Sequence, residues 1–455
     1  MIPRSFLKTR FFSALAVCAL ALAAAPAIAQ DTVAITNGRI LTGTGEIASG
    51  TVVIRNGRIS AVGPDAAVPA GARVIDAAGR VVTPGIVAVD SGIGSGEVSS
   101  VSGTNDLRQS SNSLSAAFDV SRGLDPWSIT IPVARLGGVT RAVVMPQHPG
   151  SSGGHVHEHD AAGAGHGGYH TPGLFAGQAA VVHLARGTDI LVRANVAMVA
   201  PFGEAGAGIA GGARGAEFTL FRETLAEVRL YARNRQAYER AGLRDLSLSR
   251  ADLEALIPVA EGRMPLVVSA HRAADILQVL RLAQEENIRL ILDGAEEGWL
   301  VADRIAAANV PVLLNPLANL PSNFQVRAAR QENAARLHAA GVTIAIKPGG
   351  SAHRARDARY NAGNAVANGL PFEAAIAAIT VNPARIFGQE GFGALAVGQA
   401  ADVVVWSGDP LEPLNQPEAV FIAGVEQPLQ ARNLELRDRY HPNRDRRMPH
   451  AYSPR

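Results

Sequence analysis

Apolar and polar residues alternate in short runs at the start of the folded part of the chain. The alternation passes from Val33 into an Asn-Gly turn at residues 37–38, and it recurs before a second Asn-Gly turn at residues 56–57. A period of two that is interrupted by Asn-Gly pairs is typical of β-hairpins. We therefore predict a small all-β module over residues 31–83.

The pattern changes after Pro84, where apolar β-rich runs alternate with helical stretches. Strands that alternate with helices indicate a parallel sheet, and more than 300 residues of this pattern favour a closed barrel. The sequence therefore predicts the α/β class, with a (β/α)8 TIM-type barrel over residues 84–390. The clearest strands are Val139–Val144, Leu266–Val268, Leu290–Leu292, Val312–Leu314 and Val342–Ile346, and the clearest helices are Ala274–Glu286, Ala302–Ala308 and Gln331–Ala340.

Short strands return near the end of the chain. Asp402–Trp406 and Ala419–Ile422 have the composition of buried strands. Together with residues 31–83 they predict a composite β-sandwich domain, with residues 391–430 as its second segment. A β module split between both ends of a barrel is itself a clue to the family of the chain.

The first 29 residues have the pattern of a secretory signal peptide. Arg4, Lys8 and Arg10 precede an apolar run, and Ala27-Ile28-Ala29 is a small-residue cleavage site. The run is too short to be a stable membrane span. We expect cleavage after Ala29 and a periplasmic or secreted protein, and we expect no membrane span in the mature chain.

Cysteine content and net charge exclude several kinds of function. The only cysteine, Cys18, lies within the predicted signal peptide, so the mature chain has neither disulfides nor thiolate chemistry. The formal net charge is +2, which gives no indication of nucleic-acid binding. Residues 431–455 form a basic tail. It is either solvated and partly disordered or a contact for an acidic surface.

Residues 148–173 are a histidine-rich insert without periodicity, which we expect to be a loop. Two interpretations remain. It is a solvated low-complexity insertion, or it binds Zn²⁺, Cu²⁺ or Ni²⁺ loosely. The candidate ligands are His155, His157, His159, His166 and His170.

Four local motifs give the chain a resemblance to a known family. The segment Val74–Gly85 leads into the first predicted barrel strand, Gly393–Val405 leads back to the β module, and Thr380–Ala384 lies just before it. With Gly137–Thr140, these segments resemble the amidohydrolase superfamily, in particular its imidazolonepropionase-like and dipeptidase-like branch. The resemblance covers nearly the whole mature chain. It implies a hydrolase of carbon–nitrogen bonds in cyclic amides or small dipeptides.

The resemblance also implies one or two divalent metal ions at the carboxyl ends of the barrel strands, where they activate water. The expected ligands are missing. Asp90 and Gly92 stand where the family has His-x-His, Asp293 and Gly349 replace a histidine and an aspartate, and either Ser269 or His271 occupies a further histidine position. We therefore expect no cofactor in the barrel.

The only lysine that survives processing, Lys347, lies at the end of the last predicted strand. We hypothesise that its ammonium supplies part of the missing positive charge by pairing with Asp90 or Asp293; the alternative is an ordinary surface residue. Glu296 and Glu297 come from neighbouring strand ends. A role for Lys347 as a base or Schiff-base nucleophile is a further step that nothing else in the sequence demands.

Four other residues are candidates for ligand contacts. His271 is either a residual acid–base group or a structural histidine, and with Lys347, Asp90 and Asp293 it completes the catalytic candidates. Arg272, His353 and Arg354 are candidates for binding an anionic ligand group. The expected partners are a small molecule in the barrel mouth and either further copies of the chain or a related amidohydrolase-like subunit.

Three functions remain open from the sequence. The chain is a hydrolase of the family's kind, a ligand-binding or regulatory pseudoenzyme, or a periplasmic metal-handling protein that uses the histidine-rich loop. Fold alone does not choose among them, because function depends on the site.

Overall fold

The computed structural model describes residues 32–98, 101–109, 114–148 and 173–441. The predicted signal peptide, His155 to His170, and the tail beyond residue 441 lie outside these residues. Of the basic tail, only residues 431–441 are described, and they include an exposed helix, α12. In the described part of the chain, no helix is long and apolar enough to cross a membrane.

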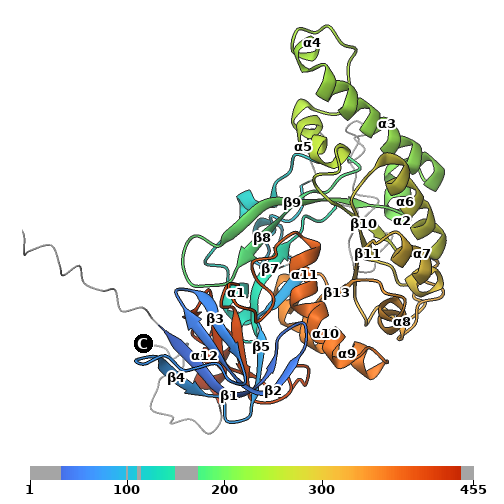
Figure 1. Ribbon diagram of the computed structural model, residues 1–455. Helices are drawn as coiled ribbons and strands as arrows, with labels where there is room; N and C mark the ends of the chain where they lie inside the picture. Colours follow the sequence, from blue (N-terminus) through green and yellow to red (C-terminus); the bar gives the residue numbers. More distant parts are fainter. Residues whose placement is uncertain (1–31, 99–100, 110–113, 149–172, 442–455) are drawn as a thin grey trace, which may run out of the picture.

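Eight strands form the sheet of a nearly closed barrel, in the order β13-β12-β11-β10-β9-β8-β7-β6. This agrees with the predicted barrel class (Figure 1). The strands are β6 (Ile86–Ser91), β7 (Val139–Val144), β8 (Gly177–His183), β9 (Leu191–Pro201), β10 (Leu266–Ala270), β11 (Leu290–Gly294), β12 (Val312–Leu314) and β13 (Ile344–Ile346).

Strand β8 departs from a regular (β/α)8 pattern, because it pairs antiparallel with both β7 and β9. The histidine-rich insert lies between β7 and β8 in the chain. Its two ends meet, since His148 Nε2 lies 3.0 Å from the carbonyl oxygen of Gly173. The chain therefore re-enters the barrel at the end where β7 left it, and β8 has to run in the opposite direction.

Helices such as α6, α7, α9 and α10 lie on the outside of the barrel, whereas α4 projects beyond it and α12 lies near the C-terminus (Figure 1). The long helix α3 and the shorter α4 and α5 lie between β9 and β10 in the chain. The α-helices are α1 (Thr130–Arg135), α2 (Glu204–Ile209), α3 (Arg214–Arg233), α4 (Arg235–Glu239), α5 (Arg250–Ala260), α6 (Ala273–Glu286), α7 (Ala302–Ala307), α8 (Asn333–Ala339), α9 (Ala358–Ala367), α10 (Phe372–Ile379), α11 (Val381–Ile386) and α12 (Arg432–Tyr440). The 3-10 turns are η1 (Ser102–Thr104), η2 (Val120–Gly123), η4 (Gly298–Val301) and η5 (Ala352–Asp357).

A second sheet is built from both ends of the described chain, in the order β16-β15-β14-β5-β1-β2-β3, with β4 paired to β1. Because β1 pairs with β4 along its first half and with β5 along its second, the sheet branches and encloses its own apolar core. The strands are β1 (Val33–Leu41), β2 (Glu46–Arg55), β3 (Arg58–Gly63), β4 (Arg73–Asp76), β5 (Val81–Pro84), β14 (Val403–Trp406), β15 (Pro417–Ile422) and β16 (Val425–Glu426).

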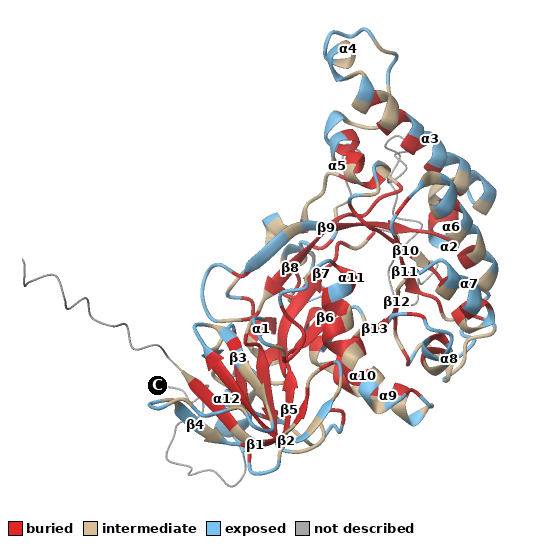
Figure 2. Cartoon of the chain, in the orientation of Figure 1, coloured by how far each residue is buried: buried red, intermediate tan, exposed pale blue. Residues whose placement is uncertain are grey.

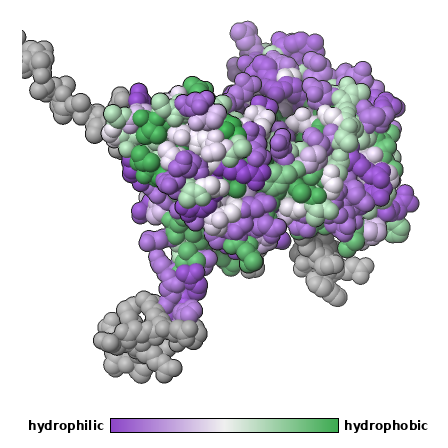
Figure 3. Space-filling model, turned by 60° about the horizontal axis from the view of Figure 1, so that its bottom comes forward, coloured by the Kyte–Doolittle hydropathy of each residue, from purple (hydrophilic) through white to green (hydrophobic). Residues whose placement is uncertain are grey.

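Alternate residues of the barrel strands face two different cores. Val87, Val267 and Ile291 belong to a cluster inside the barrel, whereas Ala88 and Val268 pack with the helices outside. This period of two fixes which side chains point inward. Figure 2 shows the barrel strands buried almost throughout, while the helices are exposed on their outer faces. On the face in Figure 3, hydrophilic and hydrophobic side chains are interspersed.

Candidate functional site

A cavity of about 710 Å³ opens at the carboxyl ends of the barrel strands. We call it the mouth cavity. Its walls combine Asp90, Ser269, His271, Asp293 and Lys347 with residues of the loops that follow the strands. Its volume lies in the range of small-molecule sites. The loops add Glu97, Arg108, Gln147, His148, Gln325, His353 and Arg354.

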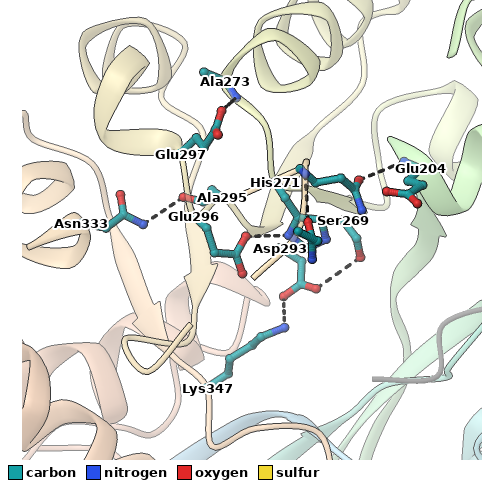
Figure 4. A network of polar contacts seen from close by, with 12 residues as sticks. Glu204, Ser269, His271, Ala273, Asp293, Ala295, Glu296, Glu297, Asn333 and Lys347 are labelled. Atoms are coloured by element: carbon teal, nitrogen blue, oxygen red, sulfur yellow. Dashed lines mark hydrogen bonds and ion pairs between the residues drawn. The ribbon is translucent and has the colours of Figure 1, made fainter. Parts of the chain in front are cut away.

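Lys347 contacts both carboxylates that the sequence offered as partners. Its Nζ lies 2.9 Å from Asp90 Oδ2 and 2.6 Å from Asp293 Oδ1. Figure 4 shows the Lys347 and Asp293 side chains pointing toward each other. The backbone of Lys347 is held as well, because its N–H donates to Leu314 and its carbonyl accepts from Asn361. One ammonium group therefore bridges two strand ends, β6 and β11.

Asp90 reaches the cavity through an irregular backbone. It has a positive φ of 49°, and the pairing of β6 with β7 shifts register between Ala88 and Ser91. Such a bulge redirects a side chain, and aspartate tolerates the left-handed region better than most residues.

Burial of the cluster shifts two pKa values. Burial raises the pKa of Asp90 and the neighbouring charge of Asp293 adds to this, while Lys347 offsets part of the shift. Burial alone would lower the pKa of Lys347, but its attraction to Asp293 and Asp90 outweighs burial and raises the pKa. Lys347 is therefore held in its protonated form, which argues against a role as a base or Schiff-base nucleophile.

Ser269 and His271 have different partners in the site. Ser269 lies opposite Asp293 in the register of β10 and β11, and its hydroxyl donates to Asp293 Oδ2 at 3.2 Å. His271 follows the end of β10, and its Nδ1 lies 2.6 Å from Glu296 Oε2. Ser269 therefore belongs to the Lys347 cluster, whereas His271 begins a second pair beside it (Figure 4).

The His271–Glu296 pair depends on a tight turn after β11. Gly294 has a φ of 92°, and a Cβ at this position would lie 2.4 Å from His271 Nδ1. Glycine thus permits the close approach. Burial alone would lower the pKa of His271, but Glu296 outweighs it and the pKa is raised. Burial alone would raise the pKa of Glu296, but His271 outweighs it and the pKa is lowered.

Two further candidates from the sequence do not line the mouth cavity. Glu297 turns away from it, and its carboxylate accepts from the backbone N–H groups of Ala273 and Ala328. The expectation that Arg272 belongs to the ligand site is also not met, because its guanidinium donates to Asp275 at 2.6 Å and it lines a separate cleft beside α3 and α6. Arg272 follows closely after the end of β10, and its side chain turns back onto Asp275 of α6, the helix that begins next to it.

The sequence analysis missed several wall residues, because loops cannot be placed from a single sequence. His148 had been assigned to the insert, yet it is buried and lines the mouth cavity. Burial lowers its pKa, although its bond to the Gly173 carbonyl opposes this. Gln325 comes from the long loop after β12, where its side chain accepts from the N–H of Glu204. The only available signal for His148 was its position just after a predicted strand.

Comparison with known proteins supports the resemblance to the amidohydrolases. The model of the family described as "Amidohydrolase family" matches residues 265–427, which include β10 to β16. The second half of the barrel and the last strands of the chain are thus similar to the amidohydrolase family. A curated relative, amidohydrolase tasK from Hapsidospora irregularis, is 25% identical over 382 residues. The match covers 80% of this chain but only 38% of the length of that relative.

Solved amidohydrolase structures share the fold. An amidohydrolase from Thermotoga maritima MSB8 superposes with a TM-score of 0.73 at 24% identity, covering 87% of this chain and 99% of the other. The structure of molinate hydrolase gives a TM-score of 0.51 at 18% identity, covering 88% and 95% of the two chains. At these identities the likeness concerns the architecture, so the chemistry has to be argued from the site itself.

The residues present do not fit the divalent metal that this superfamily implies. Among the described residues, no group of three or more His, Cys, Asp or Glu side chains could hold a metal ion. The space of one expected ligand has been filled, because a Cβ on Gly92 would lie 2.5 Å from Leu107 Cδ1. At another position, Gly349 has a φ of 101° that disfavours any side chain. The Lys347 ammonium sits between the two carboxylates that remain.

Proposed function

We propose that this amidohydrolase-fold chain binds a small molecule in its mouth cavity and works without a catalytic metal ion. The observation that carries the proposal is the contact of Lys347 Nζ with both Asp90 and Asp293. A divalent ion between these carboxylates would have to displace an ammonium group that already satisfies them. The family's hydrolysis of carbon–nitrogen bonds is then an ancestral activity, and the chain acts as a ligand-binding pseudoenzyme.

Electrostatics supports this proposal. A carboxylate left buried without a countercharge costs several kcal/mol. Lysine removes that cost with a compact charge on a flexible stem, whereas arginine would need the space of a planar fork. Glycine and serine at the expected ligand positions agree with the gain of one lysine, because both changes fit a site that holds no metal ion. It produces a stable polar floor that has no water-activating group of the metal-bound kind.

Metal analysis of the purified full-length chain tests the proposal. The histidine-rich loop would confuse the result, so a matched variant that lacks residues 149–172 is measured beside it. We expect substoichiometric metal in the loop-deleted chain, and no hydrolysis of cyclic amides or dipeptides when Zn²⁺ or Mn²⁺ is added. A stoichiometric metal that survives the deletion, or metal-dependent turnover, would restore the hydrolase interpretation.

Two parts of the proposal concern residues outside the described ones. We propose that the chain is exported after cleavage at Ala29, which N-terminal sequencing of the protein from a periplasmic extract tests directly. The metal-handling alternative rests on His155, His157 and their neighbours in the loop. Titration of Zn²⁺ into the full-length and loop-deleted chains tests that alternative. The metal-handling function requires Zn²⁺ binding by the full-length chain that is lost when the loop is deleted.

A further inference from the structure

A second cavity, of about 820 Å³, lies at the opposite end of the barrel strands. We call it the N-terminal cavity. It is lined by residues at the starts of β10 and β11 and just before β12, such as Pro265, Leu290 and Pro311. The last turns of α6 and α7 form its other wall. Because the superfamily's chemistry belongs to the carboxyl ends of the strands, this cavity is separate from the mouth cavity.

Three arginines line the N-terminal cavity without any acidic neighbour in its wall. They are Arg281 on α6, Arg289 before β11 and Arg304 on α7. In the described part of the chain, none of them forms an ion pair, and Arg289 donates only a long 3.4 Å bond to the carbonyl of Arg263. Nearby arginines behave differently, since Arg229 on α3 pairs with Glu286 at 2.6 Å.

The positive charge of the cavity exceeds what the helices compensate. Helices α6 and α7 end at this wall, and each helix C-terminus carries roughly half a negative charge. Two such ends amount to about one negative charge, against three guanidinium charges. The remaining positive charge would attract an anion, and arginine forks bind carboxylates or phosphates through paired hydrogen bonds.

The rest of the wall combines apolar and amide side chains. Leu277 and Leu280 on α6 are only partly buried, and Ile288 and Val310 lie beside the strand starts. Three amide side chains complete the polar part of the wall, Gln284, Asn287 and Asn309. The wall therefore offers apolar contacts beside polar and charged groups, and the cavity volume lies within the usual range of small-molecule sites.

We propose that the N-terminal cavity binds an organic anion, a carboxylate carried on an apolar body. The guanidinium groups of Arg281, Arg289 and Arg304 take the anionic head, and the leucines of α6 contact the apolar part. This site goes beyond the function proposed for the mouth cavity and does not depend on it, because the two cavities lie at opposite ends of the barrel.

Equilibrium dialysis of radiolabelled octanoate against the full-length chain tests this site. We expect octanoate to bind, and the triple variant R281Q/R289Q/R304Q to weaken binding at least about tenfold, which corresponds to roughly 1.4 kcal/mol. The matched control is R55Q/R193Q/R240Q. It removes the same three charges from exposed arginines outside the cavity and should bind like the unmodified chain.

Competition separates the two parts of the ligand. Unlabelled octanoate should displace the label, whereas octanol and inorganic phosphate should not, because each offers only half of the recognised chemistry. The proposal is overturned if octanoate does not bind, if both triple variants lose binding equally, or if octanol or phosphate competes as well as octanoate. Circular dichroism of the variants verifies that these surface substitutions leave the fold intact.

Discussion

At the scale of single residues, Lys347 is the cation that pairs with the carboxylates in the mouth cavity. It pairs with two carboxylates on different strands and offsets part of their charge, and each of them is largely buried. The sequence could identify this residue because it is the only lysine beyond the predicted signal peptide. It could not give the partners, since a strand register and a bulge at Asp90 decide which carboxylates meet the ammonium.

Replacing Lys347 by methionine leaves Asp90 and Asp293 without a countercharge. We expect K347M to lower the free energy of unfolding by about 3–5 kcal/mol at neutral pH. The loss should shrink in mild acid, where the carboxylates can take up protons. The triple variant K347M/D90N/D293N removes the charges together and should recover most of the stability. Urea unfolding at two pH values measures all three, and an unchanged midpoint for K347M would refute the role of the ammonium.

Glu217 is another buried carboxyl group, and it lines neither of the two cavities. It is fully buried under α2, and neither oxygen has a hydrogen-bond partner of normal geometry, although the N–H of Gly203 faces it. Burial raises the pKa of Glu217 to about 8, and the charge of Asp275 adds to this. The carboxyl group of Glu217 packs tightly against α2, because a Cβ on Gly206 would lie 1.9 Å from Glu217 Oε1.

The stability of the chain should therefore depend on the ionisation of Glu217. The folded pKa is raised, so the contribution is fully present below the unfolded value and is lost as pH rises through about 8. A pKa shift of this size corresponds to a loss of at most about 5 kcal/mol in the free energy of unfolding. The loss is smaller if α2 moves aside and admits water to the carboxylate. We expect E217Q to remove this dependence. Thermal melts of both proteins from about pH 4.5, the ordinary pKa of the group, to above 8 measure it, and parallel curves would contradict it.

At the scale of elements, the sequence predicted the regular parts well. Val139–Val144 and Val312–Leu314 are strands with the predicted bounds, and the helix expected from Ala274 begins at Ala273. The antiparallel β8 and the long helix α3 were missed. Strand direction follows from where the insert returns to the barrel, and α3 has a mixed polar surface with no break in composition, so local pattern alone could not supply either.

The barrel and the second sheet meet at a buried ion pair. Arg141 on β7 pairs with Asp402 just before β14, both are almost fully buried, and Asp402 also accepts from the N–H of Ala423. The Arg141 guanidinium lies 4.2 Å from the centre of the Phe392 ring. This pair joins the barrel to the composite sheet. Because both side chains are buried, water does not replace either partner when the other is removed.

Removing one member of the pair should be costly. We expect R141L and D402N each to lower the free energy of unfolding by about 3–5 kcal/mol, and the double variant to lose less than their sum. The exposed pair of Arg39 and Glu46 is the control, where R39A should cost less than about 1 kcal/mol. Urea denaturation of the four variants measures this. Additive effects for Arg141 and Asp402 would show that the pair is not coupled.

At the scale of the whole molecule, the composite sheet closes the chain on itself. Strand β5 lies between β1 from the first described segment and β14 from the segment that follows the barrel, so the sheet is built from both ends of the described chain. Trp406 at the end of β14 is fully buried, donates to Thr83 at 2.8 Å and covers Gly138, where a Cβ would lie 2.5 Å from its ring. The barrel and the sheet therefore share one packed boundary.

Because of this boundary, we expect the two parts to unfold together. The variant W127F/W299F keeps Trp406 as the only tryptophan, so its fluorescence reports on the boundary, while far-UV circular dichroism reports on the barrel helices. The two signals should change at the same urea concentration, as required for a single cooperative transition. A Trp406 transition at clearly lower urea would mean that the sheet detaches first. Because Trp299 donates to the carbonyl of Ala328, W127F alone is measured by circular dichroism as the control for the second substitution.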